Sequence, residues 1–250
     1  MNNNLKKIFN VVYQPILCLT IIGVFLFGSV KWAQFNQTFV VKDVKIEGIN
    51  YFDDTVLTEY KKSIKDQNIF LSNLKGYKSD IESLDHIKGC KISRVFPSTV
   101  KVEVYEREPL AMISANDLII LDSEGICLPV EYCEISLPIL SNFKNNQELY
   151  EKGKKTKSSN VLKSIDVIKY SKENFASLYT NISEFVFNED SEYEIILKNG
   201  RTKILLGDDN IFAKIDNLNA FATVLPPEKT LESYRYIDLR YKRQIVVEEI

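Results

Sequence analysis

Residues 8–30 form the longest apolar run of the chain, with no charged side chain and mostly branched or aromatic residues from Ile16 onward. A helix needs about 20 apolar residues to cross a bilayer core of roughly 30 Å. Val11–Val30 supplies that length, and Pro15 lies in the first turns, where proline is best tolerated. The pattern predicts a transmembrane signal anchor at residues 11–32, preceded by a short cytoplasmic tail at residues 1–10.

Charge around this run predicts its orientation. Lys6 and Lys7 precede it, only Lys31 follows closely, and the first 33 residues contain no acid. The positive-inside rule therefore predicts a cytoplasmic N-terminus, with the chain from Gln34 onward outside. The alternative is a cleaved signal peptide, whose apolar region would span only about 7–15 residues before small residues at the cut. Here the run is longer and Lys31-Trp32 occupies that place, which favours an uncleaved anchor.

Beyond the anchor, the pattern predicts the element order β-α-α-β-β in an α+β fold. Alternating apolar positions indicate strands, and apolar positions three or four residues apart indicate helices. The first helix is expected to be capped by Asp53 or Asp54, and the second to begin at Ser79 and end before Gly89. The strands are expected at Phe39–Gly48, Cys90–Val95 and Thr99–Glu106, and the second helix at Ser79–Ile87.

Past Pro109 the pattern changes to short strands separated by turns, with two amphipathic helices. This predicts a mixed β domain with flanking helices at residues 109–250, after an anchor-proximal domain at residues 39–108. The second helix of this domain is expected to be capped by Asp208 or Asp209, and its apolar face to carry Phe212, Ile215, Leu218 and Phe221. The strands are expected at Leu118–Leu121, Ile126–Val130, Ile182–Phe187, Tyr193–Leu197, Thr202–Leu206, Arg235–Tyr241 and Gln244–Glu248, with a hairpin turn at Lys198–Arg201 and a helix at Asn160–Asn174.

Composition narrows the class of function. The chain is 45% hydrophobic and 26% charged, which indicates a folded protein, and its net charge of −2 gives no reason to expect nucleic-acid binding. An odd number of cysteines, Cys90, Cys127 and Cys133, follows the anchor, so a disulfide framework is not expected. Cys127 and Cys133 either pair with each other or are buried thiols.

Few residues could support catalysis. His86 is the only histidine, and we expect it at the surface of a short helix rather than in a triad. The carboxylate pairs Glu106 with Glu108 and Asp122 with Glu124 are expected at a strand end and in a tight turn, respectively. The sequence therefore predicts a protein that is not an enzyme and binds no metal or cofactor.

Several stretches of the chain together resemble a known family, the FtsQ/DivIB bacterial division proteins. The stretch "SRVFPSTVKVEVYEREPLAMI" is similar to the closing pattern of that family's POTRA domain, through Arg94, Pro97, Thr99, Val102, Val104, Glu106, Arg107, Pro109 and Ala111. "IILDSEGICLP", "LKNGRTKILLG" and "YIDLRY" resemble segments of its β domain. The family often has glycine in the turn after Tyr241, whereas Lys242-Arg243-Gln244 has none, so the register of the last strand is left open.

The resemblance implies a non-enzymatic, single-pass scaffold of the divisome. It would lie in the cytoplasmic (inner) membrane at the division septum, and would bind the bitopic proteins FtsB (DivIC) and FtsL, linking them to the septal peptidoglycan synthase. We expect the POTRA domain to recruit other membrane proteins, although a role as a mere spacer is the alternative. A POTRA-containing component of envelope protein assembly or export is the competing function, and a signal-anchored wall enzyme a third.

We place the main partner site on the last strand. "QIVVEEI", Gln244–Ile250, is β-branched and is expected to pair with Arg235–Tyr241 on one side only, leaving an edge that can add a strand from another chain. The resemblance also implies that the FtsB contact lies on this strand, beside Tyr241. A core strand with disordered ends is the alternative. The expected partner-binding residues are Tyr241, Arg243, Gln244, Ile245, Val246 and Val247.

Overall fold

The computed structural model describes residues 13–52, 55–115, 117–129, 136–144, 146–199 and 202–250. Contacts divide the chain into two compact units. We call them the N-terminal unit (Met1–Gly48, Asp54–Ile81 and Cys90–Val104) and the C-terminal unit (Ile49–Asp53, Glu82–Gly89 and Tyr105–Ile250). Each is described by itself.

A single apolar helix, α2 (Gln14–Phe35), begins the described part of the chain. It ends three residues later than the predicted anchor, whose first two positions, residues 11 and 12, lie outside the described residues, and Pro15 lies in the first turn of the helix. None of its residues is buried, and among the described helices it is the one long and apolar enough to cross a membrane. The predicted cytoplasmic tail, residues 1–10, lies outside the described residues.

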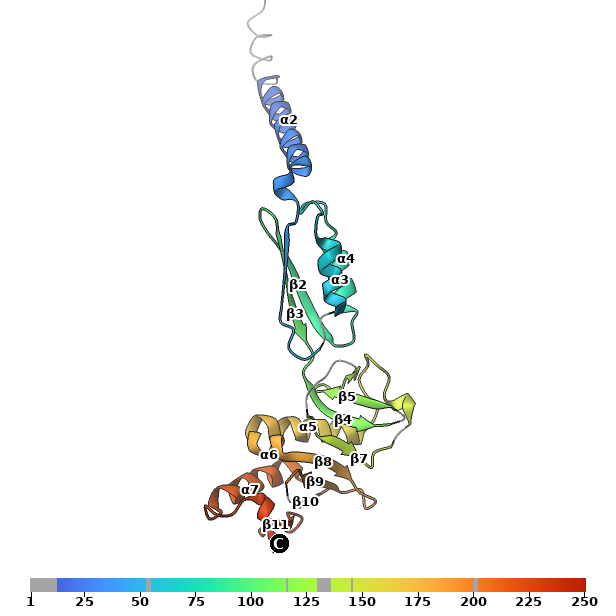
Figure 1. Cartoon of the computed structure of the whole chain (residues 1–250), viewed down its shortest axis with the longest axis vertical. Helices are drawn as coiled ribbons and strands as arrows, with labels where there is room; N and C mark the ends of the chain where they lie inside the picture. Colours follow the sequence, from blue (N-terminus) through green and yellow to red (C-terminus); the bar gives the residue numbers. More distant parts are fainter. Residues whose placement is uncertain (1–12, 53–54, 116, 130–135, 145, 200–201) are drawn as a thin grey trace, which may run out of the picture. The chain divides into compact units, whose positions relative to one another are not determined.

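The N-terminal unit contains the predicted β-α-α-β-β order, built on a three-stranded sheet with the strand order β1-β3-β2. β1 and β3 pair in parallel, with Val44 opposite Val100 and Ile46 opposite Val102. Two helices cover one face of this sheet (Figure 1). The elements, some of which continue into the C-terminal unit, are η2 (Gln37–Phe39), β1 (Asp43–Glu47), α3 (Thr55–Ile64), α4 (Leu74–Glu82), β2 (Ile87–Val95) and β3 (Thr99–Glu106).

The predicted start of the second helix was wrong. α4 begins at Leu74 rather than Ser79, because the Asn73 side chain accepts a hydrogen bond from the Gly76 backbone N–H at 3.1 Å and so caps the first turn. The predicted caps Asp53 and Asp54 lie outside the described residues.

The C-terminal unit is built on a nine-stranded mixed sheet with the order β12-β11-β10-β9-β8-β7-β4-β5-β6. This confirms the α+β class with a large β domain and flanking helices. Its strands are β4 (Pro109–Ser114), β5 (Leu118–Asp122), β6 (Cys127–Leu128), β7 (Ile139–Ser141), β8 (Ile182–Phe187), β9 (Tyr193–Leu197), β10 (Lys203–Gly207), β11 (Tyr234–Asp238) and β12 (Val246–Glu249). Its helices are η3 (Gln147–Leu149), α5 (Ser159–Asn174), α6 (Ala176–Asn181), α7 (Ile211–Val224) and η4 (Leu231–Ser233).

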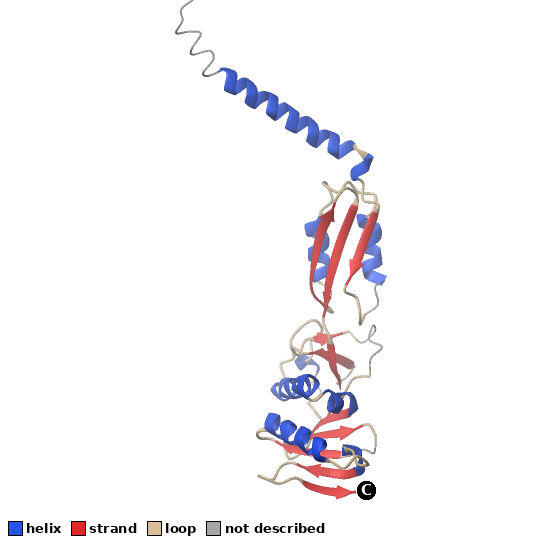
Figure 2. Ribbon diagram, turned by 90° about the vertical axis from the view of Figure 1, so that its left-hand side faces the viewer, coloured by secondary structure: helices blue, strands red, loops and turns tan. Residues whose placement is uncertain are grey.

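The core of this unit lies between the sheet and helices α5 and α7, which cover the same face of the sheet (Figures 1 and 2). Phe185 of β8 is fully buried there and is among the largest such side chains. The helices contribute Val161, Ile165 and Ile168 from α5 and Ile211, Ile215 and Leu218 from α7. Burying this apolar face is what fixes the two helices on the sheet.

Two helix predictions in this unit need correction. Neither Asp208 nor Asp209 caps α7, because Asn210 occupies the cap position without a side-chain hydrogen bond, while the Asp209 carboxylate accepts one from Lys214 at 2.7 Å. Phe212 is 43% exposed rather than part of the buried face, and its ring lies edge-on to Tyr170.

Candidate partner-binding edge

The last strand, β12, lies at one edge of the nine-stranded sheet. It pairs antiparallel with β11, and Ile237 is opposite Val247 and Asp238 opposite Val246. No other described strand pairs with its outer side. Because a strand has N–H and C=O groups along both edges, the outer edge of β12 is left with groups that can bond to an added strand.

The opposite edge of the sheet is different. β6 is only two residues long, both buried, and bridges join Ile126 to Lys155 and Cys127 to Lys152 alongside it. A short edge covered by another segment offers little room for an incoming strand. Of the two edges of this sheet, β12 is therefore the one that can accept a partner.

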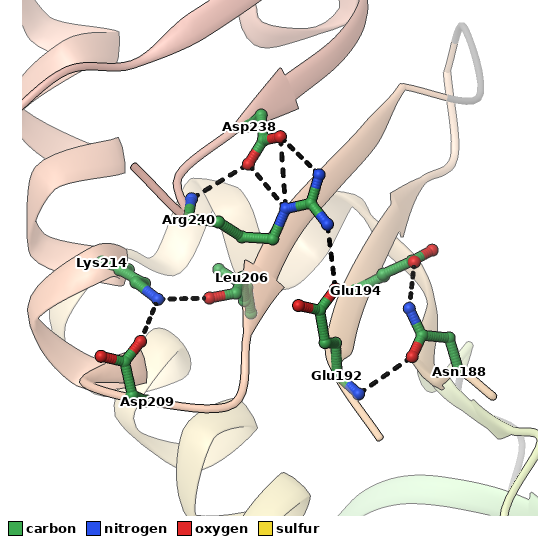
Figure 3. Close-up of polar contacts among 8 residues, drawn as sticks. All are labelled: Asn188, Glu192, Glu194, Leu206, Asp209, Lys214, Asp238 and Arg240. Atoms are coloured by element: carbon green, nitrogen blue, oxygen red, sulfur yellow. Dashed lines mark hydrogen bonds and ion pairs between the residues drawn. The ribbon is translucent and has the colours of Figure 1, made fainter. Parts of the chain in front are cut away.

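A polar network fixes the turn that leads from β11 into β12 (Figure 3). The Asp238 carboxylate is buried and accepts hydrogen bonds from the Arg240 backbone N–H at 3.0 Å, from Nε at 3.0 Å and from Nη2 at 2.7 Å. Nη1 of Arg240 donates to Glu192, next to β9, at 3.0 Å. The Leu239 N–H also donates to the Leu205 carbonyl, so the backbone stays tied to β10 one residue past β11.

The network shifts the acid–base properties of both partners. Burial by itself raises the pKa of Asp238, but the hydrogen bonds and charge of Arg240, with a smaller contribution from Lys214, outweigh it and lower the pKa below its ordinary value. The same pair raises the pKa of Arg240. Asp238 is therefore charged at neutral pH and holds Arg240 in place.

A buried cation, Lys214, fixes the start of α7 (Figure 3). Its Nζ donates to the Leu206 carbonyl at the end of β10 and to the Asp209 carboxylate, both at 2.7 Å. The hydrogen bond and charge of Lys214 lower the pKa of Asp209. These contacts join α7 to β10.

Between α7 and the turn lies a groove of about 470 Å³. One wall is the exposed side of α7 and the other is the turn between β11 and β12. The lining residues are Asn217, Ala220, Phe221 and Val224 on α7 and Leu239, Tyr241, Arg243, Gln244 and Ile245 in the turn. Its mixture of apolar and polar side chains suits a peptide or an amphipathic segment better than a small anion.

The structure brings four of the six predicted residues together in the turn wall of the groove: Tyr241, Arg243, Gln244 and Ile245. Tyr241 is 53% exposed, Arg243 adopts a positive φ of 65°, and Ile245 packs partly against the core. The other two, Val246 and Val247, lie in β12. Pairing was expected from Gln244 onward, but β12 begins only at Val246, because the turn occupies the residues before it.

Sequence reasoning missed the α7 wall of the groove. Val224 is 77% exposed although it continues the apolar spacing of Leu218 and Phe221 toward the end of the helix. This apolar residue, which lies beyond the last buried turn of α7, was the one feature of the sequence that could have indicated the groove. Nothing in the sequence indicated that Asn217 and Ala220 face the turn.

The residues considered for catalysis make structural contacts. Glu106 accepts hydrogen bonds from the backbone N–H groups of Asn50 and Tyr51, and Glu108 pairs with Lys172 at 2.5 Å. Asp122 is buried, accepts from the backbone N–H groups of Glu124 and Ile126, and pairs with Arg107 at 2.9 Å. Glu106 and Asp122 therefore bind the backbone of nearby loops and turns, and Glu108 pairs with helix α5.

His86 differs from the expected surface position, whereas Cys127 matches the buried thiol that was one of its two expected states. His86 is 8% exposed rather than at the surface, its ring packs against Phe52 at 4.8 Å between centroids, and burial lowers its pKa. Cys127 is a buried free thiol, and burial raises its pKa to about 11. Cys133, its proposed partner, lies outside the described residues.

The fold and the edge together define a class: a protein with one N-terminal apolar helix, a small β-α-α-β-β domain and a mixed β domain. Comparison with known families agrees. Residues 39–107 match the POTRA domain, FtsQ-type, and residues 108–247 match the family described as FtsQ/DivIB, C-terminal related. The chain belongs to the FtsQ/DivIB family of cell division proteins.

Individual relatives carry matching names. A cell division protein FtsQ from Geobacter sp. (strain M21) is 26% identical over 64% of this chain, and the match spans 58% of that protein's length. DivIB from Clostridium acetobutylicum is 24% identical over 82% of this chain and 80% of its own length. FtsQ from Vibrio cholerae is 25% identical over 90% of this chain and 81% of its own length.

Proposed function

We propose that this protein is a non-enzymatic scaffold of the bacterial divisome. It spans the cytoplasmic membrane once through α2, with the N-terminus in the cytoplasm and both units outside, and it acts at the division septum. Its partners are bitopic proteins of the FtsB (DivIC) and FtsL type, through which it connects to septal peptidoglycan synthesis. Support comes from the family, the apolar helix α2 and the outer edge of β12, with which no other described strand pairs.

The observation that carries this proposal is the open outer side of β12. An extended segment of an FtsB-like partner adds there as a further strand, so that backbone hydrogen bonds supply much of the affinity. Val247 is partly exposed and is followed by the acidic Glu248 and Glu249, whose charge disfavours pairing with unrelated strands.

The groove beside the turn supplies selectivity. Tyr241 is an exposed aromatic at its rim, and Arg243 places a cation next to it. Aromatic and arginine side chains at the centre of an interface often carry a large share of the binding energy. A partner that adds a strand to β12 therefore brings its neighbouring residues over the α7 groove.

Two proline substitutions test strand addition. Consecutive N–H groups of a strand point to opposite edges, so of Val246→Pro and Val247→Pro only one removes an outward donor. That variant should keep the melting temperature of the unaltered chain and lose at least about tenfold in affinity for an FtsB-like segment, a change worth about 1.4 kcal/mol. The other variant should lower the melting temperature, because it breaks pairing with β11.

Tyr241→Ala gives an independent check on the groove. Because this side chain is largely exposed, its loss should leave the melting temperature unchanged and weaken binding in calorimetric titration. If the proline variant with unchanged melting temperature binds the segment as tightly as the unaltered chain, the partner does not add a strand at β12.

A further inference from the structure

One end of the N-terminal unit carries a cluster of exposed apolar side chains. The loop between α3 and α4 and the turn between β2 and β3 meet beside the end of α2 (Figure 1). We call this cluster the apolar tip. Its exposed members are Phe35, Phe70, Leu71, Val95 and Phe96.

Aromatic rings connect the tip without a break to the apolar helix. Trp32 contacts Phe39 with 6.0 Å between ring centroids, Phe39 contacts Phe70 at 5.2 Å, and Phe70 contacts Phe96 at 5.3 Å. The series starts in the last turn of α2 and ends at an exposed phenylalanine in the β2–β3 turn.

Hydrogen bonds hold the tip in this form. The Asn68 side chain donates to the carbonyls of Ala33 and Gln34 at 3.2 and 2.7 Å, which fixes the α3–α4 loop to the end of α2. Arg94 donates to the carbonyls of Ile69 and Ser72 at 2.6 and 3.2 Å, which fixes β2 to the same loop. The exposed rings are therefore presented by anchored backbone.

The parts of the two loops that carry the tip contain no charged residue; Lys65 and Asp66 lie earlier in the α3–α4 loop. Neither Ile69–Ser72 nor Val95–Ser98 contains an acidic or basic side chain, although 26% of the whole chain is charged. A soluble surface seldom presents several large apolar residues together unless they meet another apolar phase or a partner. Here the apolar phase next to the cluster is the lipid bilayer that the apolar helix α2 can cross.

We propose that the apolar tip inserts into the interfacial layer of the lipid bilayer that α2 spans. Trp32 and Phe35 mark the interface at the end of the helix, where aromatic residues collect, and the ring contacts place Phe70 and Phe96 next to that level. The ligand is the bilayer itself. The N-terminal unit is then attached to the membrane at two places, α2 and the tip, which restricts how far it can swing about the end of the helix.

The chain contains a single tryptophan, Trp32, so fluorescence can report the depth of one site at a time. The full chain is reconstituted in vesicles containing phosphatidylcholine brominated on its acyl chains, which quenches nearby indoles. In a Trp32→Phe background, Phe96→Trp and Leu71→Trp each place the indole at the tip. Tyr105→Trp is the matched control, since Tyr105 is exposed but lies about 20 Å along β3 from Thr99.

We expect the indoles at positions 96 and 71 to be quenched nearly as strongly as Trp32 in the unaltered chain, and the indole at position 105 to be unaffected. Circular dichroism should be the same for all variants, because each substitution replaces an exposed side chain. Testing two positions of the tip controls for the case in which one of the substitutions disturbs its own loop. Quenching at positions 96 and 71 no greater than at position 105 would overturn the proposal, since vesicles offer lipid and no protein partner.

Discussion

The contact between Asp238 and Arg240 should contribute measurably to the stability of the C-terminal unit. Asp238→Asn keeps the shape of the side chain but removes its charge and one of its two acceptor oxygens, both of which bond to Arg240. A hydrogen bond to a charged group contributes about 1.5–3 kcal/mol, and we take about 2 because the Arg240 side chain is 39% exposed and can regain water. For a domain of this size, about 2–4 °C per kcal/mol gives a fall in melting temperature of about 4–8 °C.

The pH dependence separates this contact from a general loss of packing. Because folding lowers the pKa of Asp238, its stabilising contribution is fully present above the ordinary aspartate pKa of about 3.9 and is lost as the pH falls through the lower, folded-state pKa. Differential scanning calorimetry of the chain in detergent should therefore show a difference between the unaltered chain and Asp238→Asn that is full at pH 7 and shrinks in that acidic range.

Arg235→Ala is the control. Arg235 pairs with Glu248 at 3.7 Å, and both side chains are largely exposed, so its loss should cost less than about 0.5 kcal/mol. The reasoning fails if Asp238→Asn melts with the unaltered chain at pH 7, if the difference is independent of pH, or if Arg235→Ala costs as much.

Two further predictions concern the whole chain in the cell. Alkaline phosphatase fused after Ile250 should be active, because this enzyme folds only outside the cytoplasm. If that fusion is inactive and a reporter that works only in the cytoplasm is active at the same position, the proposed topology is contradicted. Replacing residues 39–107 by an unrelated domain of similar size should abolish recruitment of a fluorescent fusion to the septum, whereas unchanged recruitment would mean that the POTRA domain is only a spacer.

Sequence patterns predicted best those strands with one buried face. β3, β8 and β9 have the bounds that the sequence predicted. In β3 and β9 every second residue is buried, such as Val100, Val102 and Val104 of β3, whereas β8 buries Ile182, Phe185 and Val186. The sequence patterns did not predict β4 and β7, for two different reasons. Leu110, Ala111 and Ile113 of β4 are all buried, so the strand shows no alternation, and β7 is three residues long and pairs in parallel with distant strands on both sides.

In the candidate site, too, one part could be predicted from the sequence and the other could not. That the last strand forms an edge follows from its β-branched residues and a single nearby strand to pair with, and the structure places β12 there. The groove could not be predicted, because it depends on α7 lying beside the turn. That position is fixed by the contacts of Lys214 with Leu206 and Asp209, which join separate elements across a fold that periodicity does not describe.

Few contacts stabilise β12 in this sheet. The strand is four residues long, no other described strand pairs with its outer side, and only Val246 within it and Ile245 just before it are partly buried. Its main contacts are therefore those with β11 and the ion pair of Glu249 with Lys229. The preceding turn, by contrast, is fixed by the buried Asp238 and its bonds to Arg240. A strand added to the outer side would pair the second edge of β12 and cover Val247, so partner binding and ordering of β12 reinforce each other. By linkage, any partner that binds only the ordered edge must stabilise ordered β12 by RT ln(1 + c/Kd), where c is the concentration of free partner.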